Sequence, residues 1–143
     1  MKLIKRRPRV NEEESITIVT HKETEITRRI EEILTKRTLS VSSDNLQLKI
    51  DTKDVYYIES VDFKSFIYTR TGIYLSKMRL YELENNLPQH DFMRINRQSI
   101  LNIRKIESVS SAGAGRVEVR LKNDDRLIVS RQYAPILKEK FGL

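Results

Sequence analysis

Residues 92–109 read FMRINRQSILNIRKIESV and combine core-forming residues with cations in one short stretch. The cations, which alternate with large apolar residues, are Arg94, Arg97, Arg104 and Lys105. The polar side chains between them are Asn96, Gln98, Ser99 and Asn102. Side chains of these types contact phosphates and base edges in duplex DNA. The same pattern also fits a buried strand with a solvated basic face, because charged residues usually face water. The remaining sequence is needed to choose between a DNA-binding segment and a buried strand with a basic outer face.

The composition is that of a globular protein. The chain has 143 residues, of which 38% are hydrophobic and 33% charged, so neither a disordered nor a fibrous class fits. Its length favours one domain of ordinary size. The absence of cysteine excludes disulfides and thiolate metal sites. The opening MKLIKRRPRV lacks the apolar run of a secretory signal, and we therefore expect a cytoplasmic location.

The positive charge is concentrated around the opening stretch. The formal net charge is +7, from 27 Lys and Arg against 20 Asp and Glu. Residues 90–132 contain nine basic and five acidic side chains, whereas residues 41–89 contain six and seven. Clustered positive charge favours a polyanionic partner such as nucleic acid.

The N-terminal part predicts a charged tail, a short strand and an amphipathic helix. Residues 1–14 form the tail, and residues 16–18 alternate as in a strand. Thr20 with Glu23 predicts a capping box at the start of a helix that ends near Arg37. One face of this helix holds Ile26, Ile30, Ile33 and Leu34. This face either packs on its own domain or forms a dimer or partner surface.

From Leu39 onward the hydrophobic period changes from that of a helix to that of strands. The alternating or β-branched and aromatic runs are LSVS, LQLKI, VYYIES, FIYT and IYLS. A helix with one apolar face interrupts them at residues 80–87, and Pro88 ends it. We expect a strand at residues 92–96 and a tight helical turn at residues 98–101.

The C-terminal part predicts further strands and a last helix. Residues 103–109 fit a strand, and residues 110–115 fit a loop of small residues. Residues 117–129 fit a hairpin with its turn at residues 122–125. Pro135 suits the first turn of a helix, where no amide hydrogen is needed. The predicted fold class is mainly β, with about ten short strands and few helices.

A series of motifs runs through the second part of the chain. They are DVYYIES at 54–60, LYELE at 80–84 followed by LP at 87–88, FMRINR at 92–97 running to Asn102, RVEV at 116–119, LKN at 121–123 and VSRQYA at 129–134. In order and spacing they resemble the LytTR DNA-binding domain, found at the C-terminus of many bacterial response regulators. We therefore divide the chain into an N-terminal extension, residues 1–37, and a LytTR-like domain, residues 38–143.

The resemblance implies an elongated β fold that reads duplex DNA from loops in successive major grooves and bends the duplex. The expected base contacts are Ser65, Asn96, Arg97, Gln98 and Arg131. The expected phosphate contacts are Lys64, Arg94, Arg104, Lys105 and Ser130. Arg94 also fits an internal ion pair that holds the turn. The family often has His where Asn96 stands, and His or Tyr near Ser65, so its base preference does not transfer to this chain.

The extension is too short for the receiver domain that two-component members of the family carry. The chain therefore resembles the stand-alone members, which are controlled by a membrane partner or by their own abundance. We expect paired DNA sites, and a homodimer or a membrane or regulatory protein partner that binds through residues 16–37.

The residues of an enzyme site are not found together in the sequence. His21 and His90 are the only histidines, and neither has a partner at metal-ligand or triad spacing. Asp124 and Asp125 fit ordinary turn chemistry. The AGAG at residues 112–115 lacks the Lys-Ser or Lys-Thr of a phosphate-binding loop. We expect no catalysis, no metal, no cofactor and no small-molecule substrate.

Two other binding classes remain open, an RNA-binding β module and a protein-interaction module. The aromatic residues able to stack on unpaired bases are Tyr56, Tyr57, Phe63, Phe66, Tyr68 and Tyr74. Most of them alternate as core residues do. The favoured prediction is a bacterial transcription regulator that binds promoter DNA and performs no chemistry.

Overall fold

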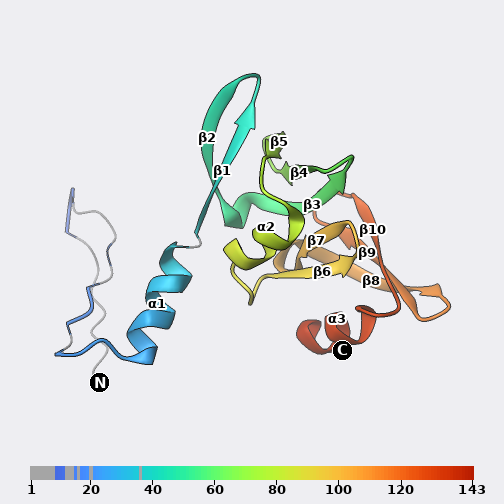
Figure 1. The fold of residues 1–143 in the computed structure, drawn as a ribbon. Coiled ribbons are helices and arrows are strands. Elements are labelled where there is room, and N and C mark those ends of the chain that lie inside the picture. Colours follow the sequence, from blue (N-terminus) through green and yellow to red (C-terminus); the bar gives the residue numbers. More distant parts are fainter. Residues whose placement is uncertain (1–8, 12–14, 16, 20, 36) are drawn as a thin grey trace.

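The computed structural model describes residues 9–11, 15, 17–19, 21–35 and 37–143, which form two antiparallel sheets and three α-helices (Figure 1). The seven-stranded sheet has the order β2-β1-β5-β4-β3-β7-β6, and the three-stranded sheet has the order β10-β9-β8. The strands of the larger sheet are β1 (Thr38–Ser43), β2 (Leu46–Asp51), β3 (Val55–Val61), β4 (Lys64–Thr69), β5 (Ile73–Ser76), β6 (Phe92–Asn96) and β7 (Ser99–Asn102). Those of the smaller sheet are β8 (Ile106–Gly113), β9 (Arg116–Leu121) and β10 (Arg126–Val129). The helices are α1 (Glu25–Thr35), α2 (Leu80–Asn86) and α3 (Ala134–Phe141), with 3-10 turns η1 (Thr52–Asp54) and η2 (Ile103–Lys105). The predicted mainly β fold is confirmed.

Strand β3 is buried on both faces and separates two hydrophobic clusters. Val55, Tyr56, Tyr57 and Ile58 are all buried, as expected for a strand that is covered on both sides. In a regular strand successive side chains point to opposite faces. A register shift between Val55 and Tyr57 marks an irregularity of the bulge type, which lets Tyr56 and Tyr57 join the same cluster.

The two clusters form one core on each side of the larger sheet. The cluster under α2 contains Leu39, Val41, Val55, Ile58, Ile67, Leu80, Leu83, Leu87, Phe92 and Ile100. The cluster between the two sheets and α3 contains Tyr56, Tyr57, Met93, Ile95, Leu101, Ile103, Ile106, Val117, Val119, Leu121, Val129, Ala134 and Leu137. Strands β6 and β7 supply residues to both clusters. The turn between these strands is therefore anchored on two sides, and the cations beside it stand on a rigid support.

The hydroxyl of Tyr57 ties the larger sheet to the turn between β9 and β10. It donates a hydrogen bond to Oδ2 of Asp125 over 3.1 Å. Its ring stacks on the ring of Tyr68, with centroids 4.2 Å apart. Burial, and then the Asp125 carboxylate, raise the pKa of Tyr57 well above its ordinary value of 10.0. The phenol therefore keeps its proton and its bond to Asp125 throughout the neutral range.

The N-terminal extension differs from its prediction at two points. Residues 15 and 17–19 form no strand, while Ile16 lies outside the described residues. An isolated strand leaves its backbone groups unpaired, so an alternating pattern alone does not make one. Helix α1 begins at Glu25, where Thr24 and Thr27 exchange backbone-to-side-chain hydrogen bonds of 2.9 and 3.3 Å. The observed cap thus lies one turn later than the predicted one, whose Thr20 is outside the described residues.

Helix α1 keeps part of its apolar face in solvent. Ile26 is 54% exposed and Ile33 is 51% exposed, while Ile30 is half-buried. The side chain of Leu34 lies outside the described residues. Within the described ranges, no helix is long and apolar enough to cross a membrane. The use of the α1 face as a partner surface stays a prediction.

Two predictions in the second half of the chain are wrong. Residues 98–101 do not form a helical turn, because Ser99–Asn102 is strand β7 and pairs with β3 on one side and β6 on the other. The backbone hydrogen bonds available from two neighbours outweigh a local helical preference. Residues 110–113 are not a loop, because they extend β8 and pair with β9 as far as Gly113.

Candidate nucleic-acid interface

Four connections meet at one end of the domain, which we call the loop end. They are the β3–β4 turn (residues 62–63), the β6–β7 turn (97–98), the β8–β9 turn (114–115) and the β10–α3 loop (130–133). Strand β3 is hydrogen-bonded to the β6–β7 turn, since the Ser60 amide donates to the Gln98 carbonyl over 2.8 Å. The Ser130 amide donates to the Ile95 carbonyl over 2.8 Å. Segments far apart in sequence therefore share one surface, toward the right of Figure 1.

A depression of about 630 Å³ lies between the β6–β7 turn and the β10–α3 loop. Its lining residues are Asn96, Arg97, Gln98, Ser130, Arg131, Gln132 and Tyr133. Arg97 and Arg131 are exposed, and neither forms an ion pair with any described residue. Two exposed guanidinium groups beside amide and hydroxyl groups can offer hydrogen-bond donors to a large polar ligand. Five of the ten predicted contact residues line this depression.

The β6–β7 turn is held by its own side chains. The Asn96 side chain accepts from the Gln98 amide over 2.8 Å, which closes a local turn. The amide group of Asn96 donates to the Ile128 carbonyl over 3.4 Å and reaches the smaller sheet. Asn96 is therefore already occupied in holding the turn, whereas the side chain of Gln98 is exposed.

Arg94 has an internal role. Its Nε lies 3.2 Å from Oε2 of Glu84 on α2, and its other guanidinium nitrogen donates to the Arg97 carbonyl over 2.8 Å. The side chain is only 20% exposed. Of the two roles predicted for Arg94, the structure shows the internal ion pair, because both of its bonding directions are taken by protein groups. Arg94 thereby fixes the backbone that carries Arg97.

The stem of Arg131 packs on the β8–β9 turn. A Cβ placed on Gly115 would lie 2.8 Å from Cγ and 3.0 Å from Cδ of Arg131, closer than real contacts allow. Gly115 also has a backbone φ of +78°, which L side chains rarely adopt. The missing side chain of Gly115 thus makes room for Arg131. The small residues at 110–115 predicted a loop, and their pattern gave no sign of a contact between this glycine and Arg131.

Ser65 is not at the surface. It is 1% exposed, and its hydroxyl donates to the Met78 carbonyl over 2.8 Å. The side chain faces the α2 side of the sheet together with Ile67, because residues two apart in a strand share a face. The neighbouring Lys64 is exposed at the start of β4. A base contact from Ser65 therefore conflicts with this structure, whereas Lys64 is accessible at the loop end.

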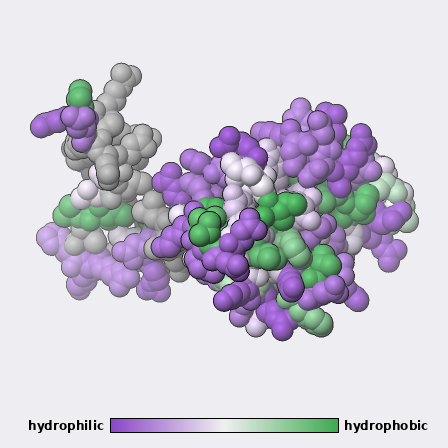
Figure 2. Space-filling model, turned by 90° about the horizontal axis from the view of Figure 1, so that it is seen from above, coloured by the Kyte–Doolittle hydropathy of each residue, from purple (hydrophilic) through white to green (hydrophobic). Residues whose placement is uncertain are grey.

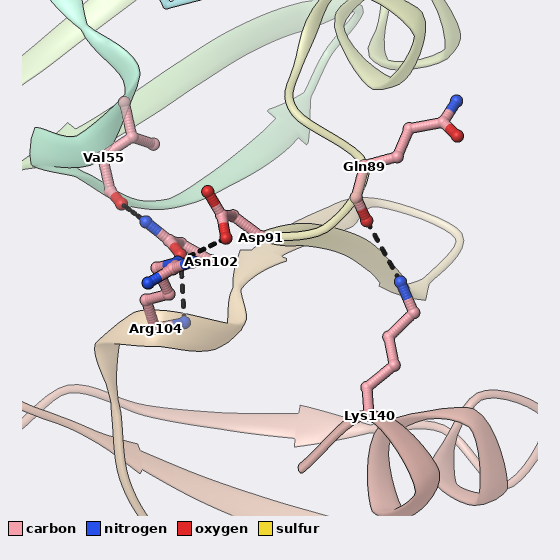
Figure 3. A network of polar contacts seen from close by, with 6 residues as sticks. All are labelled: Val55, Gln89, Asp91, Asn102, Arg104 and Lys140. Atoms are coloured by element: carbon pink, nitrogen blue, oxygen red, sulfur yellow. Dashed lines mark hydrogen bonds and ion pairs between the residues drawn. The ribbon is translucent and has the colours of Figure 1, made fainter. Parts of the chain in front are cut away.

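Arg104 lies at the opposite end of β7, which we call the far end (Figure 3). Lys105 follows it in the turn η2. Arg104 pairs with Asp91, and this hydrogen bond and charge raise the pKa of the guanidinium. The Arg104 amide donates to Oδ1 of Asn102, whose own amide group donates to the Val55 carbonyl over 2.8 Å. Nζ of Lys105 lies 5.0 Å from the centroid of the Tyr56 ring. The two cations are close to Arg97 in sequence, but β7 separates them from it in space.

The family whose model matches the chain is described as the LytTr DNA-binding domain, and the match covers residues 45–142. The chain belongs to the LytTR family. The match spans most of both sheets and includes every position of the loop end. It begins inside the β1–β2 hairpin, so α1 lies outside it.

Two relatives of this LytTR chain come from Staphylococcus aureus and Bacillus cereus. An HTH-type transcriptional regulator of Staphylococcus aureus is 33% identical over 94 residues, which cover 66% of this chain and 63% of the relative. A sensory transduction protein, LytT, of Bacillus cereus is 32% identical over 90 residues, which cover 63% of this chain and 37% of the relative. The matched part thus spans less than two thirds of the length of either relative.

A solved LytTr DNA-binding domain from Bacillus cereus has the same fold. It superposes with a TM-score of 0.70 at 22% identity, and the match covers 75% of this chain and 98% of the solved one. The LytTR fold of this chain places no two helices in succession within the described residues, since strands separate α1, α2 and α3. The loop end is built mainly from turns and strand ends, together with the start of α3.

Residues able to bind a metal ion do not cluster in the described part of this LytTR domain. Within that part, no group of three or more His, Asp or Glu side chains lies close enough to hold a metal ion. His21 and His90 are both exposed and belong to segments far apart in the sequence. The loop end remains the surface where the structure gathers polar and cationic side chains.

Proposed function

We propose that the protein is a transcription regulator that binds duplex DNA through its loop end. The observation that carries this proposal is the depression between the β6–β7 turn and the β10–α3 loop, where Arg97 and Arg131 stand exposed without a carboxylate partner among the described residues. An unpaired guanidinium needs no ion pair broken before it binds a new acceptor. Membership of the LytTR family supports duplex DNA as that acceptor.

The loop-end side chains divide by chemistry into base readers and phosphate contacts. Arg97 and Arg131 can each make a bidentate contact to O6 and N7 of guanine in the major groove. Gln98 can make the corresponding contact to adenine. Lys64 can contact a phosphate through its ammonium charge, and Ser130 can donate a hydrogen bond from its hydroxyl to a phosphate oxygen. We leave Ser65, Arg94, Arg104 and Lys105 out of the proposed contact set because of their burial, their ion pairs or their place at the far end.

An RNA-binding module is less well supported by the aromatic residues. Stacking on unpaired bases needs exposed ring faces. Tyr56 and Tyr57 are 8% and 7% exposed, and Phe66, Tyr68 and Tyr74 are half-buried. Phe63 is the one exposed ring of this set, and one ring does not make a stacking platform.

The proposal includes a role for the extension and a cytoplasmic setting. Residues 16–37 would supply self-association or a partner surface through the exposed part of α1, so that two domains fill paired sites together. Deleting residues 1–37 should leave binding to a half-site almost unchanged and weaken occupancy of a paired site, because the effective concentration of the second domain is lost. Unfolding of the truncated protein would instead assign α1 to the core.

The test of DNA binding is a competition at fixed salt between the best duplex, selected from a random library, and single-stranded RNA of the same sequence. We expect the duplex to win and its log affinity to fall with log salt by about 0.9 per phosphate contact. EDTA should leave the affinity unchanged. Equal binding of the RNA, or an affinity for duplex that does not change with salt, would contradict the proposal.

A further inference from the structure

The β3–β4 turn places an aromatic ring in solvent at the loop end. Phe63 is 83% exposed and is the most exposed aromatic side chain of the described residues. Hydrophobic residues interrupt the hydrophilic surface in several patches when the molecule is viewed from above (Figure 2). Single exposed apolar residues are common on protein surfaces. Exposure alone therefore gives Phe63 no function, and its backbone has to be considered.

The backbone at Phe63 is one that a phenylalanine seldom adopts. Asp62 has a φ of +49° and Phe63 a φ of +64°, and together they form a two-residue connection in which Val61 pairs with Lys64. Hairpin turns with two positive φ values favour Asn-Gly or Asp-Gly. A residue with a Cβ in this conformation costs about 1–2 kcal/mol, and for a bulky side chain it is an outlier. Glycine at position 63 would relieve this cost.

The fold gains little from the ring in exchange. The ring buries almost none of its surface in the domain. Its one recorded ring contact is with the guanidinium of Arg79, whose Cζ lies 5.2 Å from the ring centroid. At an exposed site such a contact contributes about 0.5–1 kcal/mol. A strained and solvated aromatic residue at a ligand-binding end is better explained by the ligand than by the fold.

The β3–β4 turn lies at the same end of the sheet as the depression. Strands β3, β7 and β6 are neighbours in the sheet, and Ser60 of β3 is bonded to Gln98 of the β6–β7 turn. Cations flank the ring, with Lys64 next to it in sequence and Arg79 over it. A duplex held by Arg97 and Arg131 would have these cations toward its phosphates and the ring toward its groove.

We propose that Phe63 contacts the C5-methyl group of a thymine in the major groove and is a specificity-determining residue. This inference rests on the proposed function. The ring carries no hydrogen-bonding group, and the apolar feature that a base pair presents in the major groove is the thymine methyl. The Arg79 guanidinium lies over the ring. Phe63 thus adds an apolar contact to the polar contacts of Arg97 and Arg131.

The test replaces each thymine of the best duplex in turn by deoxyuridine, which removes the methyl group and keeps the base pair. For the full chain we expect one position at which the affinity falls about fourfold, the value of one buried methyl-sized group. Phe63→Ala should lose a similar factor on the thymine duplex and show no difference between thymine and uracil at that position. The two changes would then be non-additive, as groups in contact are.

Two variants separate a role in recognition from a role in the fold. Phe63→Gly should raise the melting temperature, since it relieves the strained turn, and should still lose the discrimination between thymine and uracil. Phe141→Ala removes a 37% exposed ring at the end of α3, whose Lys140 bonds to the Gln89 carbonyl at the far end, and should keep the discrimination between thymine and uracil. A lower melting temperature for Phe63→Gly would mean that the ring supports the fold.

The outcomes distinguish this inference from the proposed function. If the full chain binds duplex with the expected salt dependence but Phe63→Ala discriminates uracil as well as the natural sequence does, only the thymine contact is wrong. If 2-aminopurine fluorescence shows unstacking that depends on Phe63, the ring inserts between bases, and the methyl contact is also wrong. If no duplex is preferred at any salt, the proposed function itself fails.

Discussion

Both ends of the LytTR domain carry cations, and the two ends differ in what those cations contact. At the loop end Lys64, Arg97 and Arg131 are exposed, with no ion pair to a described residue. At the far end Arg104 pairs with Asp91, and Lys105 lies over a tyrosine ring. Charge density in the sequence therefore does not locate a binding surface. We propose that the exposed cations lining the depression, Arg97 and Arg131, mark that surface.

The polar side chains of the far end connect elements of the fold to one another. Its polar contacts link η2 to β3 through Asn102, and α3 to the segment before β6 through Lys140 (Figure 3). A cation that already makes such a contact within the protein would have to break it to bind a phosphate. At the loop end Arg97 and Arg131 have no ion pair with a described residue, so a polyanion would bind there without breaking one.

The largest effect is expected for Arg94→Ala, which removes the support of the loop end. The substitution leaves the Arg97 carbonyl without its donor and Glu84 without its cation, and hydrogen bonds to charged groups contribute about 1.5–3 kcal/mol each. We expect both the free energy of unfolding and the affinity for the best duplex to fall. Urea titration and fluorescence anisotropy measure the two effects. Arg104→Ala, which breaks an exposed pair at the far end, should change the affinity much less, and a reversed order would contradict the comparison.

Arg131→Ala should affect binding alone. The side chain is exposed, so we expect the free energy of unfolding to change by less than about 0.5 kcal/mol. Loss of a bidentate base contact should weaken binding to the best duplex by about 1–3 kcal/mol and relax the preference at one base pair. Single-base variants of the duplex measure that preference. An equal loss on every duplex would make Arg131 a phosphate contact, and no loss would place the β10–α3 loop outside the groove.

Tyr57→Phe should affect stability alone, because Asp125 lies at the far end. Removal of the hydroxyl should lower the free energy of unfolding by about 1 kcal/mol at neutral pH. The pKa of Tyr57 is raised in the folded state, so its contribution is complete below pH 10 and is lost as the pH rises through the folded-state pKa. The variant should therefore lose stability less steeply than the natural protein above pH 10. Identical alkaline profiles, or a weaker affinity for DNA, would contradict this assignment.

A loss of affinity smaller than that of Arg131→Ala is expected for Gly115→Ala, with Gly113→Ala as its control. Both have φ near +80°, but a Cβ on Gly113 meets nothing within 4 Å, whereas one on Gly115 meets Arg131. Alanine at either position should cost about 1–2 kcal/mol of stability through backbone strain. Only Gly115→Ala should also weaken binding to the best duplex, because it displaces the stem of Arg131. Equal affinities for the two variants would show that the packing on Gly115 does not position the guanidinium.

The sequence predicted the strands better than the places of the charges. The β-branched and aromatic run VYYIES identifies β3, and the alternation in RVEV identifies β9, because each strand has at least one face against a core. The strand β7 was missed because it lies between the adjacent β6 and the distant β3 and all four of its residues are buried, so no alternation marks it. The partners of Arg94 and Arg104 depend on Glu84 and Asp91, ten and thirteen positions away in sequence. Their ion pairs arise only when the helix, the strands and η2 come together.

The central claim is that the loop end, and not the far end, contacts the phosphates of DNA. The direct measurement is the slope of log affinity against log salt for the best duplex with the natural protein, Lys64→Ala and Lys105→Ala. The two lysines are matched in charge and lie at opposite ends of the sheet. We predict that Lys64→Ala reduces the magnitude of the slope by about 0.9, the contribution of one phosphate contact, and that Lys105→Ala leaves the slope unchanged. A reduced slope for Lys105→Ala together with an unchanged slope for Lys64→Ala would contradict the claim.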